Sequence, residues 1–379
     1  MSHDATPASQ APGADQLAAM RAAILAGRTA DILQAAEAVI VTAADPATVV
    51  EAVIARADAL AQVGLLADAF SLLKTSYDKE HAAGRLDGAA QLRLAESALR
   101  MASGDTQAAI SSLVQAANDF GDAGATANQI RAQLQLATVY AVTSQPDSVR
   151  QVLQGCLTAA QQLGDPGVLA EVLHQEGSFL MATGGDPAQS FADGVQAADR
   201  SGAATARIQL RVDLACAVAR ADANQAATLI AAAQGIATAL TDPLACANGL
   251  ATAAQGWWAI GQAADCLRCA DQALSQLRGA AAWPMFVRLA VVITDMCTAA
   301  GRSEDAQRYL GAATAAGERV GGPAGAANVM VMLGQAAMQR GDRMSAQQDF
   351  RDAVARLQAA GLPVPPQLSA ALANPGQPR

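Results

Sequence analysis

Lysine is nearly absent from this sequence of 379 residues: it occurs only at Lys74 and Lys79, and the net charge is −9. A chain with this net negative charge and no arginine-rich cluster would be repelled by nucleic acid and by anionic membranes. Neither lysine follows a glycine-rich stretch, which excludes a phosphate-binding P-loop. Nucleic acid and membrane insertion are therefore not expected among the interactions of this protein.

The usual sequence signatures of catalysis are also missing. No G-x-S-x-G or H-E-x-x-H pattern occurs, and the three histidines, His3, His81 and His174, are scattered along the chain. Histidine is the commonest general acid or base, so this distribution gives no sign of a His-dependent site. We predict that the protein is not an enzyme and has no catalytic residues, metal site or cofactor.

Aromatic residues make up only 3% of the sequence although apolar residues reach 52%, so Ala, Leu and Val must build the core. Ala and Leu favour helices, and small side chains let helices approach closely. Runs of alternating β-branched residues, which are typical of strands, are almost absent. A chain of this length would usually divide into domains, but a repeat array needs each unit to pack only on its neighbours. The sequence predicts an all-α fold.

Turn residues recur at a step of 40 residues. Six of these turn residues are glycines: Gly64, Gly104, Gly184, Gly261, Gly301 and Gly341. Ser144 falls on the same step, 40 residues after Gly104 and 40 before Gly184. A shorter unit turns near Ala221 and Asp222, and Gly27 adds an earlier one. These nine turns predict nine helix-turn-helix units.

Fixed distances from these turns carry the same kinds of residue. A small residue lies seven positions before the turn at Ala57, Ala137, Gly177, Ala254 and Gly334, whereas Ser97, Leu214 and Thr294 depart from the pattern. Alanine lies five and twelve positions after most turns, and a large apolar residue lies nine after, at Leu73, Leu113, Leu153, Ile230, Leu310 and Phe350. Proline opens the next unit at Pro166, Pro243, Pro323 and Pro363. The second helix of each unit should therefore bury one stripe.

This pattern resembles the tetratricopeptide repeat, and it covers roughly residues 15–362. The 40-residue step exceeds the usual length of about 34 residues, as in the long units of bacterial regulators such as the maltose-regulon activator and of kinesin light chains. The resemblance implies a right-handed α-solenoid whose first helices line a concave surface.

We expect a disordered tail over residues 1–14, the solenoid over 15–362, and a short capping segment with a flexible tail over 363–379. The charge-free stretches Ala223–Thr241 and Leu244–Ala264 are long enough to span a membrane, but polar amides interrupt them, and buried helices are the better interpretation. The N-terminus has no signal pattern, and six cysteines without a small secreted framework suit a reducing compartment. We expect a cytoplasmic, bacterial protein.

The tetratricopeptide resemblance implies that partners contact the first helix of each unit. Thirteen residues before the turn stands a polar ladder of Glu51, Gln91, Arg131, Glu171, Asn248, Arg288 and Asn328, whereas the sixth unit has Ile208 there and Arg211 close by. The residues predicted to face the same groove are Asp58, His174, Ser178, Gln255, Trp258, Asp295 and Gln335. A plain solvated face is the alternative interpretation of this ladder.

Trp258 is the strongest candidate anchor in this groove. Trp257 falls on the core aromatic position four residues before the turn, which turns Trp258 about 100° toward the concave side. Exposed tryptophan is a frequent anchor of interfaces. The alternative is that both indoles pack between neighbouring units.

Cys266 and Cys269 form a C-x-x-C pair on one helical face, with Cys246 and Cys297 in adjoining helices. Such a group could hold a metal or act in redox chemistry. However, Cys266 occupies the alanine position five residues after the turn, and Cys156 the one twelve residues after it. Free cysteine packs as a small apolar residue, so packing is the favoured interpretation, with a role for Cys266 and Cys269 left open.

Together these features predict a non-enzymatic scaffold or adaptor that holds a protein or peptide in its concave groove. Two alternatives remain at this point. The chain could sense a small ligand inside the superhelix, or it could assemble with copies of itself as a component of a larger complex.

Overall fold

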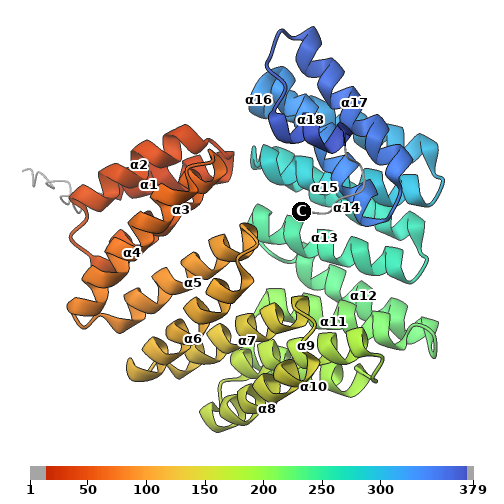
Figure 1. Cartoon of the computed structure of the whole chain (residues 1–379). Helices are drawn as coiled ribbons and strands as arrows, with labels where there is room; N and C mark the ends of the chain where they lie inside the picture. Colours follow the sequence, from red (N-terminus) through yellow and green to blue (C-terminus); the bar gives the residue numbers. More distant parts are fainter. Residues whose placement is uncertain (1–13, 374–379) are drawn as a thin grey trace, which may run out of the picture. The chain divides into compact units, whose positions relative to one another are not determined.

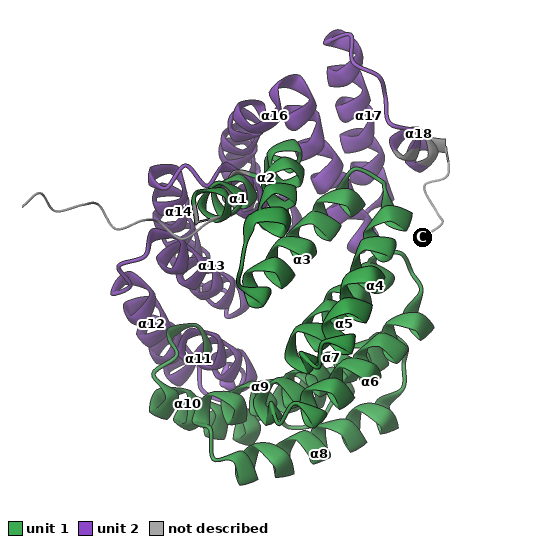
Figure 2. Ribbon diagram, turned by 90° about the vertical axis from the view of Figure 1, so that its left-hand side faces the viewer, with its two compact units in different colours: residues 1–206 green, residues 207–379 purple. Residues whose placement is uncertain are grey.

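The chain folds into α-helices joined by short turns (Figure 1). The computed structural model describes residues 14–373, and no strand occurs within that range. The chain divides into two compact units, Met1–Ala206 and Arg207–Arg379 (Figure 2). The predicted all-α repeat fold is confirmed in each unit.

Consecutive helices pair into helix-turn-helix hairpins, in which we call the first helix A and the second helix B. The helices of unit 1 are α1 (Ala14–Ala26), α2 (Thr29–Thr42), α3 (Pro46–Gln62), α4 (Leu66–Ala82), α5 (Leu86–Ala102), α6 (Thr106–Asp122), α7 (Thr126–Val142), α8 (Pro146–Leu163), α9 (Pro166–Thr183) and α10 (Ala188–Ser201). The boundary between the units falls within α11 (Ala204–Val218), and unit 2 continues with α12 (Ala223–Thr238), α13 (Pro243–Ala259), α14 (Ala263–Gly279), α15 (Trp283–Ala299), α16 (Ser303–Gln339), α17 (Arg343–Ala359) and α18 (Pro366–Ala373).

The long element α16 is two helices joined at a kink. Gly321 and Gly322 have non-helical backbone angles, with φ of 58° at Gly322, and Pro323 follows. Residues 303–320 are therefore the B helix of one hairpin, and residues 323–339 are the A helix of the next. Residues 14–373 then contain nine hairpins, as the nine turns in the sequence predict, followed by α18.

Left-handed glycines close most of the turns. Gly64 ends α3 with φ of 84°, and the N–H of Leu65 donates to the carbonyl of Leu60. This Schellman ending strains any residue that has a Cβ. Similar glycines also separate one hairpin from the next, at Gly84, Gly124, Gly164 and Gly202. The turn therefore recurs about every 20 residues in unit 1, whereas the 40-residue pattern predicted only alternate turns.

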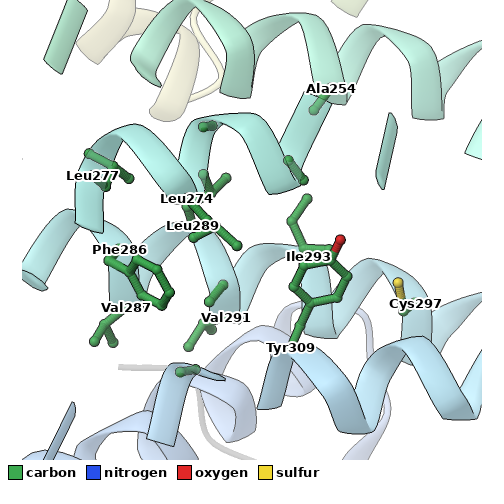
Figure 3. Close-up of a cluster of buried hydrophobic side chains, with 14 of the residues drawn as sticks. Ala254, Leu274, Leu277, Phe286, Val287, Leu289, Val291, Ile293, Cys297 and Tyr309 are labelled. Carbon is green, nitrogen blue, oxygen red and sulfur yellow. The ribbon is translucent and has the colours of Figure 1, made fainter. Parts of the chain in front are cut away.

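Each B helix buries the predicted stripe, with one exception. Leu73, Leu113 and Phe350 are among the buried residues nine positions after a turn, but Leu310 is only half-buried. The preceding residue, Tyr309, fills the core instead and is 2% exposed (Figure 3). The larger ring reaches further into the core, where its hydroxyl finds hydrogen-bond partners. The expectation for Leu310 was therefore wrong by one residue.

The small residue seven positions before the turn lets the two helices of a hairpin approach closely. A Cβ built on Gly177 would lie 2.4 Å from the ring of Phe191, and one on Gly334 would lie 2.5 Å from the ring of Phe350. Atoms at such distances overlap. Glycine is therefore required at these two positions because phenylalanine faces them, and the predicted narrow position is confirmed.

The last described segment departs from the prediction for Pro363. This residue was expected to open a unit, but it lies in a stretch without helical structure, and α18 begins only at Pro366. Proline disfavours the helical conformation of the residue before it, so the closely spaced prolines delay the helix. Leu368 of α18 is buried in the core of unit 2. Residues 374–379, and the predicted N-terminal tail apart from Ala14, lie outside the described residues.

Helices α12 and α13 cover most of the two charge-free stretches of the sequence. Their buried residues, such as Ile230 and Leu250, belong to the core of unit 2. Within residues 14–373, no helix combines the length and the hydrophobicity that crossing a bilayer requires.

Helix α17 carries a carboxyl group that should make stability depend on pH. Burial and the neighbouring Asp352 and Asp342 raise the pKa of Asp349 to about 6, although Arg340 acts in the opposite direction. The folded state therefore holds this proton more tightly than the unfolded state, and stability is lost as pH rises from about 4 to 6. A tenfold change in proton affinity is worth about 1.4 kcal/mol, so Asp349→Asn should raise the free energy of unfolding by about 2 kcal/mol at pH 8.

Urea denaturation at pH 8 and at pH 4 checks this expectation, since the gain should shrink toward zero at pH 4. Asp122→Asn, at an exposed position of unit 1, controls for the change of net charge. A gain of equal size at both pH values would show that burial of the Asp349 carboxylate is not its source.

Candidate partner-binding face

In unit 1 all four members of the predicted ladder take part in hydrogen bonds within the unit. Arg131 of α7 donates through Nε and Nη2 to the carboxylate of Glu171 on α9, at 2.9 and 3.0 Å. Glu51 of α3 accepts a similar pair of hydrogen bonds from Arg21 of α1, at 2.8 and 2.7 Å. The hydrogen bonds from Arg21 lower the pKa of Glu51. These ion pairs connect the first hairpin to the second and the fourth to the fifth.

Amide contacts extend this line between α5 and α7. Gln91 donates to Asp87 at 2.7 Å, and Asn128 donates to the other oxygen of Asp87 at 3.2 Å. Asn128 in turn accepts from Arg131 at 3.2 Å. The side chains of Arg131 and Glu171 remain 45% and 39% exposed, so their pair contributes about 1 kcal/mol or less. A partner on this face of unit 1 would have to compete with these internal contacts.

The other residues predicted for the groove in unit 1 differ in exposure. Asp58 reaches solvent, although the surrounding protein raises its pKa through partial burial. His174 and Ser178 are half-buried on α9, and the His174 ring centroid lies 6.4 Å from that of Phe191.

In unit 2 the predicted residues form two rows across α13, α15 and residues 323–339. The members of a row are 40 residues apart, and the two members on each helix are seven residues apart, which places them on one helical face. One row consists of Asn248, Arg288 and Asn328, and the other of Gln255, Asp295 and Gln335. Five of these six side chains are exposed.

The sixth member of these rows, Asp295, is half-buried and forms an ion pair with Arg340, the residue that follows α16. Its carboxylate is therefore already bound, which the sequence did not predict. Arg211 of α11 also has an internal contact, because its Nη1 donates to the carbonyl of Arg207 at 3.0 Å.

A third row, which is not among the predicted groove residues, runs between the two polar rows. It is formed by Thr252, Val292 and Met332, which lie four residues after the members of the first row. Val292 is 39% exposed, and the other two are half-buried. The 40-residue period could have revealed this row. The A-helix face of unit 2 therefore has a weakly polar centre between two polar borders.

The two adjacent tryptophans have different environments. Trp257 is 7% exposed and donates its indole N–H to Gln234 at 3.2 Å, so its predicted core position is confirmed. Trp258 is half-buried and packs against the core of unit 2. The role of Trp258 as a partner anchor remains a prediction, with only part of its indole available for contact.

The cysteines lie mostly in the cores. All six are free thiols, and only Cys216 is not fully buried. Burial raises the pKa of Cys266 to about 12 and that of Cys269 to about 11. Since the thiolate is the reactive form and the metal ligand, protonated thiols of this kind are inert at neutral pH. Within residues 14–373, no group of three or more His, Cys, Asp or Glu side chains has the arrangement of a metal site.

Alkylation at pH 7.5 should therefore proceed in two phases. Cys216 should react first with iodoacetamide because it is partly exposed, although burial and Asp213 raise its pKa too. Cys266 and Cys269 should react at least about tenfold more slowly, because they are buried and their raised pKa values leave little thiolate. Mass spectrometry of tryptic peptides after timed quenching would measure the order, with the urea-unfolded chain as control. Fast modification of Cys266 in the folded chain would contradict its burial.

The structure also joins three polar residues that the sequence pattern did not single out. The Tyr309 hydroxyl donates to Asp271 at 2.8 Å, and Arg308 donates to the hydroxyl at 2.7 Å and to Asp271 at 3.1 Å. The partners lie on consecutive B helices, α14 and the first part of α16. Arg308 and Tyr309 follow Asp271 by 37 and 38 residues, which is close to the 40-residue repeat step. This spacing is the sequence signal that could have indicated the contact.

Comparison with known proteins identifies no sequence relative. No protein-family model matches the chain, and none of the curated proteins matches it. Similar solved structures include the apo form of the quorum sensor NprR from B. thuringiensis, with 14% identity and a TM-score of 0.47 over 78% of this chain and 85% of that one. Aspartyl phosphate phosphatase F from Bacillus subtilis has 8% identity and a TM-score of 0.47 over 96% and 98%.

A tetratricopeptide repeat protein from Parabacteroides merdae is also similar, with 14% identity and a TM-score of 0.36 over 86% of this chain and 97% of that one. The structures that this chain resembles thus include tetratricopeptide repeat proteins, and the assignment of the repeat class rests on its own nine hairpins.

Proposed function

We propose that this chain is a non-enzymatic scaffold that binds an extended segment of a partner protein on the A-helix face of unit 2. The supporting observation is the pair of exposed polar rows on three consecutive A helices, with a weakly polar row between them. Asparagine and glutamine side chains both donate and accept hydrogen bonds. They can therefore pair with the N–H and C=O groups of an extended main chain whatever its sequence.

The spacing of the helices suits such a ligand. Packed helices lie about 8–10 Å apart, and an extended chain advances about 3.3 Å per residue. Each A helix would then meet every third residue of the peptide. A segment of roughly six to nine residues would cross all three helices.

The centre of the face suggests which residues the segment carries. Val292 offers an exposed apolar contact, and Met332 has an adaptable side chain that fits varied apolar partners. Arg288 stands beside Val292 on the same helix and favours a carboxylate. The preferred segment therefore has an apolar residue followed or preceded by an acidic one.

Selection from a phage-displayed peptide library tests this proposal. The selected peptides should bind the purified chain, and Asn248→Ala combined with Asn328→Ala should weaken binding about 30-fold, since each lost hydrogen bond contributes about 1 kcal/mol. Fluorescence anisotropy of a labelled peptide would measure the affinity.

Two exposed glutamines of α14 provide a matched control. Gln272→Ala combined with Gln276→Ala removes two amides from a B helix and should leave the affinity within about twofold. If the selected peptides bound the Asn248/Asn328 variant as tightly as they bind this control, the proposed face would be wrong.

A further inference from the structure

A small pocket in unit 2 is separate from the A-helix rows. It lies between α14 and residues 303–320 of α16, with a contribution from α15, and its volume is about 280 Å³. This is below the range of about 300–1,000 Å³ that is typical of drug-sized ligands, so it suits one or two side chains. Its lining residues are Asp271, Leu274, Ser275, Arg278, Phe286, Arg308, Tyr309 and Ala312.

Two guanidinium groups of this pocket lie over aromatic rings. Arg278 lies 5.6 Å from the ring centroid of Phe286, and Arg308 lies 4.4 Å from that of Tyr309. Figure 3 shows Phe286 and Tyr309 in the same core cluster. A guanidinium held by its flat face against a ring keeps N–H groups at its edge, where they can donate to an anion in the plane.

A third pair of the same kind adjoins the pocket. Arg319 lies 4.9 Å from the ring of Trp283, whose centroid is 5.8 Å from that of Phe286. The chain has only 12 aromatic residues, three Trp, three Tyr and six Phe. Three of them, Phe286, Tyr309 and Trp283, pair with arginines in or beside the pocket. Trp283 can therefore report ligand binding by its fluorescence.

The charges of the pocket decide which anion fits it. Asp271 accepts hydrogen bonds from both Arg308 and Tyr309, so it offsets the charge of Arg308. Arg278 is exposed, and no carboxylate among residues 14–373 lies within ion-pair distance of it. The lining residues therefore carry one uncompensated positive charge, which suits a singly charged carboxylate better than a doubly charged phosphate.

We propose that this pocket binds a carboxylate of an acidic partner peptide. Arg278 and the hydroxyl of Ser275 bind the carboxylate, while Leu274 and the partly exposed Ala312 contact an apolar group beside it. The pocket does not depend on the proposed A-helix face, because the two share no residue. It gives the scaffold a second binding surface, on its B helices.

Titration with two small probes tests the proposal. N-acetylphenylalanine carries a carboxylate beside a phenyl group, and N-acetylphenylalaninamide carries the same phenyl group without the charge. The acid should change the tryptophan fluorescence of the full chain saturably, and the amide should bind at least about tenfold more weakly. Arg278→Gln should weaken binding of the acid by a similar factor, with circular dichroism confirming that the variant is folded.

Arg356→Gln is the matched control, since Arg356 is an exposed arginine of α17 outside this pocket. This variant should bind the acid as the parent chain does. Equal binding of acid and amide, or an Arg278→Gln variant that binds the acid unchanged, would overturn the proposal. Stronger competition by inorganic phosphate than by acetate would overturn the assignment to a carboxylate.

Discussion

Replacing Gly325 by alanine should lower the free energy of unfolding of unit 2 by about 3 kcal/mol, at the upper end of the cost of overpacking a core. A Cβ at this position would lie 2.0 Å from the carbonyl oxygen of Gly317, on the other side of the kink in α16. The clash involves backbone rather than a flexible side chain, so the two helix segments must move apart. All three tryptophans lie in unit 2, and urea denaturation followed by tryptophan fluorescence reports on this unit directly.

Gly311 provides the control on the same element. It is exposed in the first half of α16, and a Cβ there would meet nothing within 4 Å. Gly311→Ala should therefore stabilise the chain by about 0.5–1 kcal/mol, because alanine favours the helix over glycine. The close approach of the two segments would be refuted if Gly325→Ala were as stable as Gly311→Ala.

Gly334→Ala should cost about 1–3 kcal/mol, because the new methyl group overlaps the ring of Phe350. The repeat also indicates a second substitution that should compensate for this loss of stability. Ala57 stands at the equivalent position of an earlier hairpin, where Leu73 replaces phenylalanine. The combination Gly334→Ala with Phe350→Leu should therefore recover most of the lost stability.

A double-mutant cycle measures this coupling. Phe350→Leu alone should destabilise unit 2 by leaving a cavity, so the two single changes should cost more in sum than the double variant does. The same cycle at Gly177 and Phe191 tests the rule independently in unit 1, with far-UV circular dichroism as the signal. Strictly additive costs in both cycles would show that the glycines do not compensate for the phenylalanines.

The repeat and its packing stripe could be predicted from the sequence because they depend on local rules that recur. A left-handed turn needs glycine, and a closely approached helix needs a small residue, whichever hairpin is considered. A single turn residue or small residue is a weak signal, but its recurrence in nine units identifies the repeat. This is why the turns at Gly64 and Gly341 and the narrow position at Gly177 could be identified.

The contacts of the candidate face could not be predicted in the same way. Whether Glu171 is exposed to a partner or paired with Arg131 depends on the side-chain conformations of two separate hairpins. The ion pair of Asp295 with Arg340 and the burial of Tyr309 in place of Leu310 likewise depend on single local contacts. A period averages over such exceptions, so it places residues on a face without identifying their partners.

The packing of each hairpin only on its neighbours also has a mechanical consequence. A pulling force applied to the two ends would meet a series of similar hairpins, each of which packs mainly on its neighbours. Each 40-residue hairpin that detached would lengthen the chain by up to about 140 Å, at roughly 3.5 Å per residue. In single-molecule stretching, the chain should therefore extend in a succession of nearly equal steps at low force.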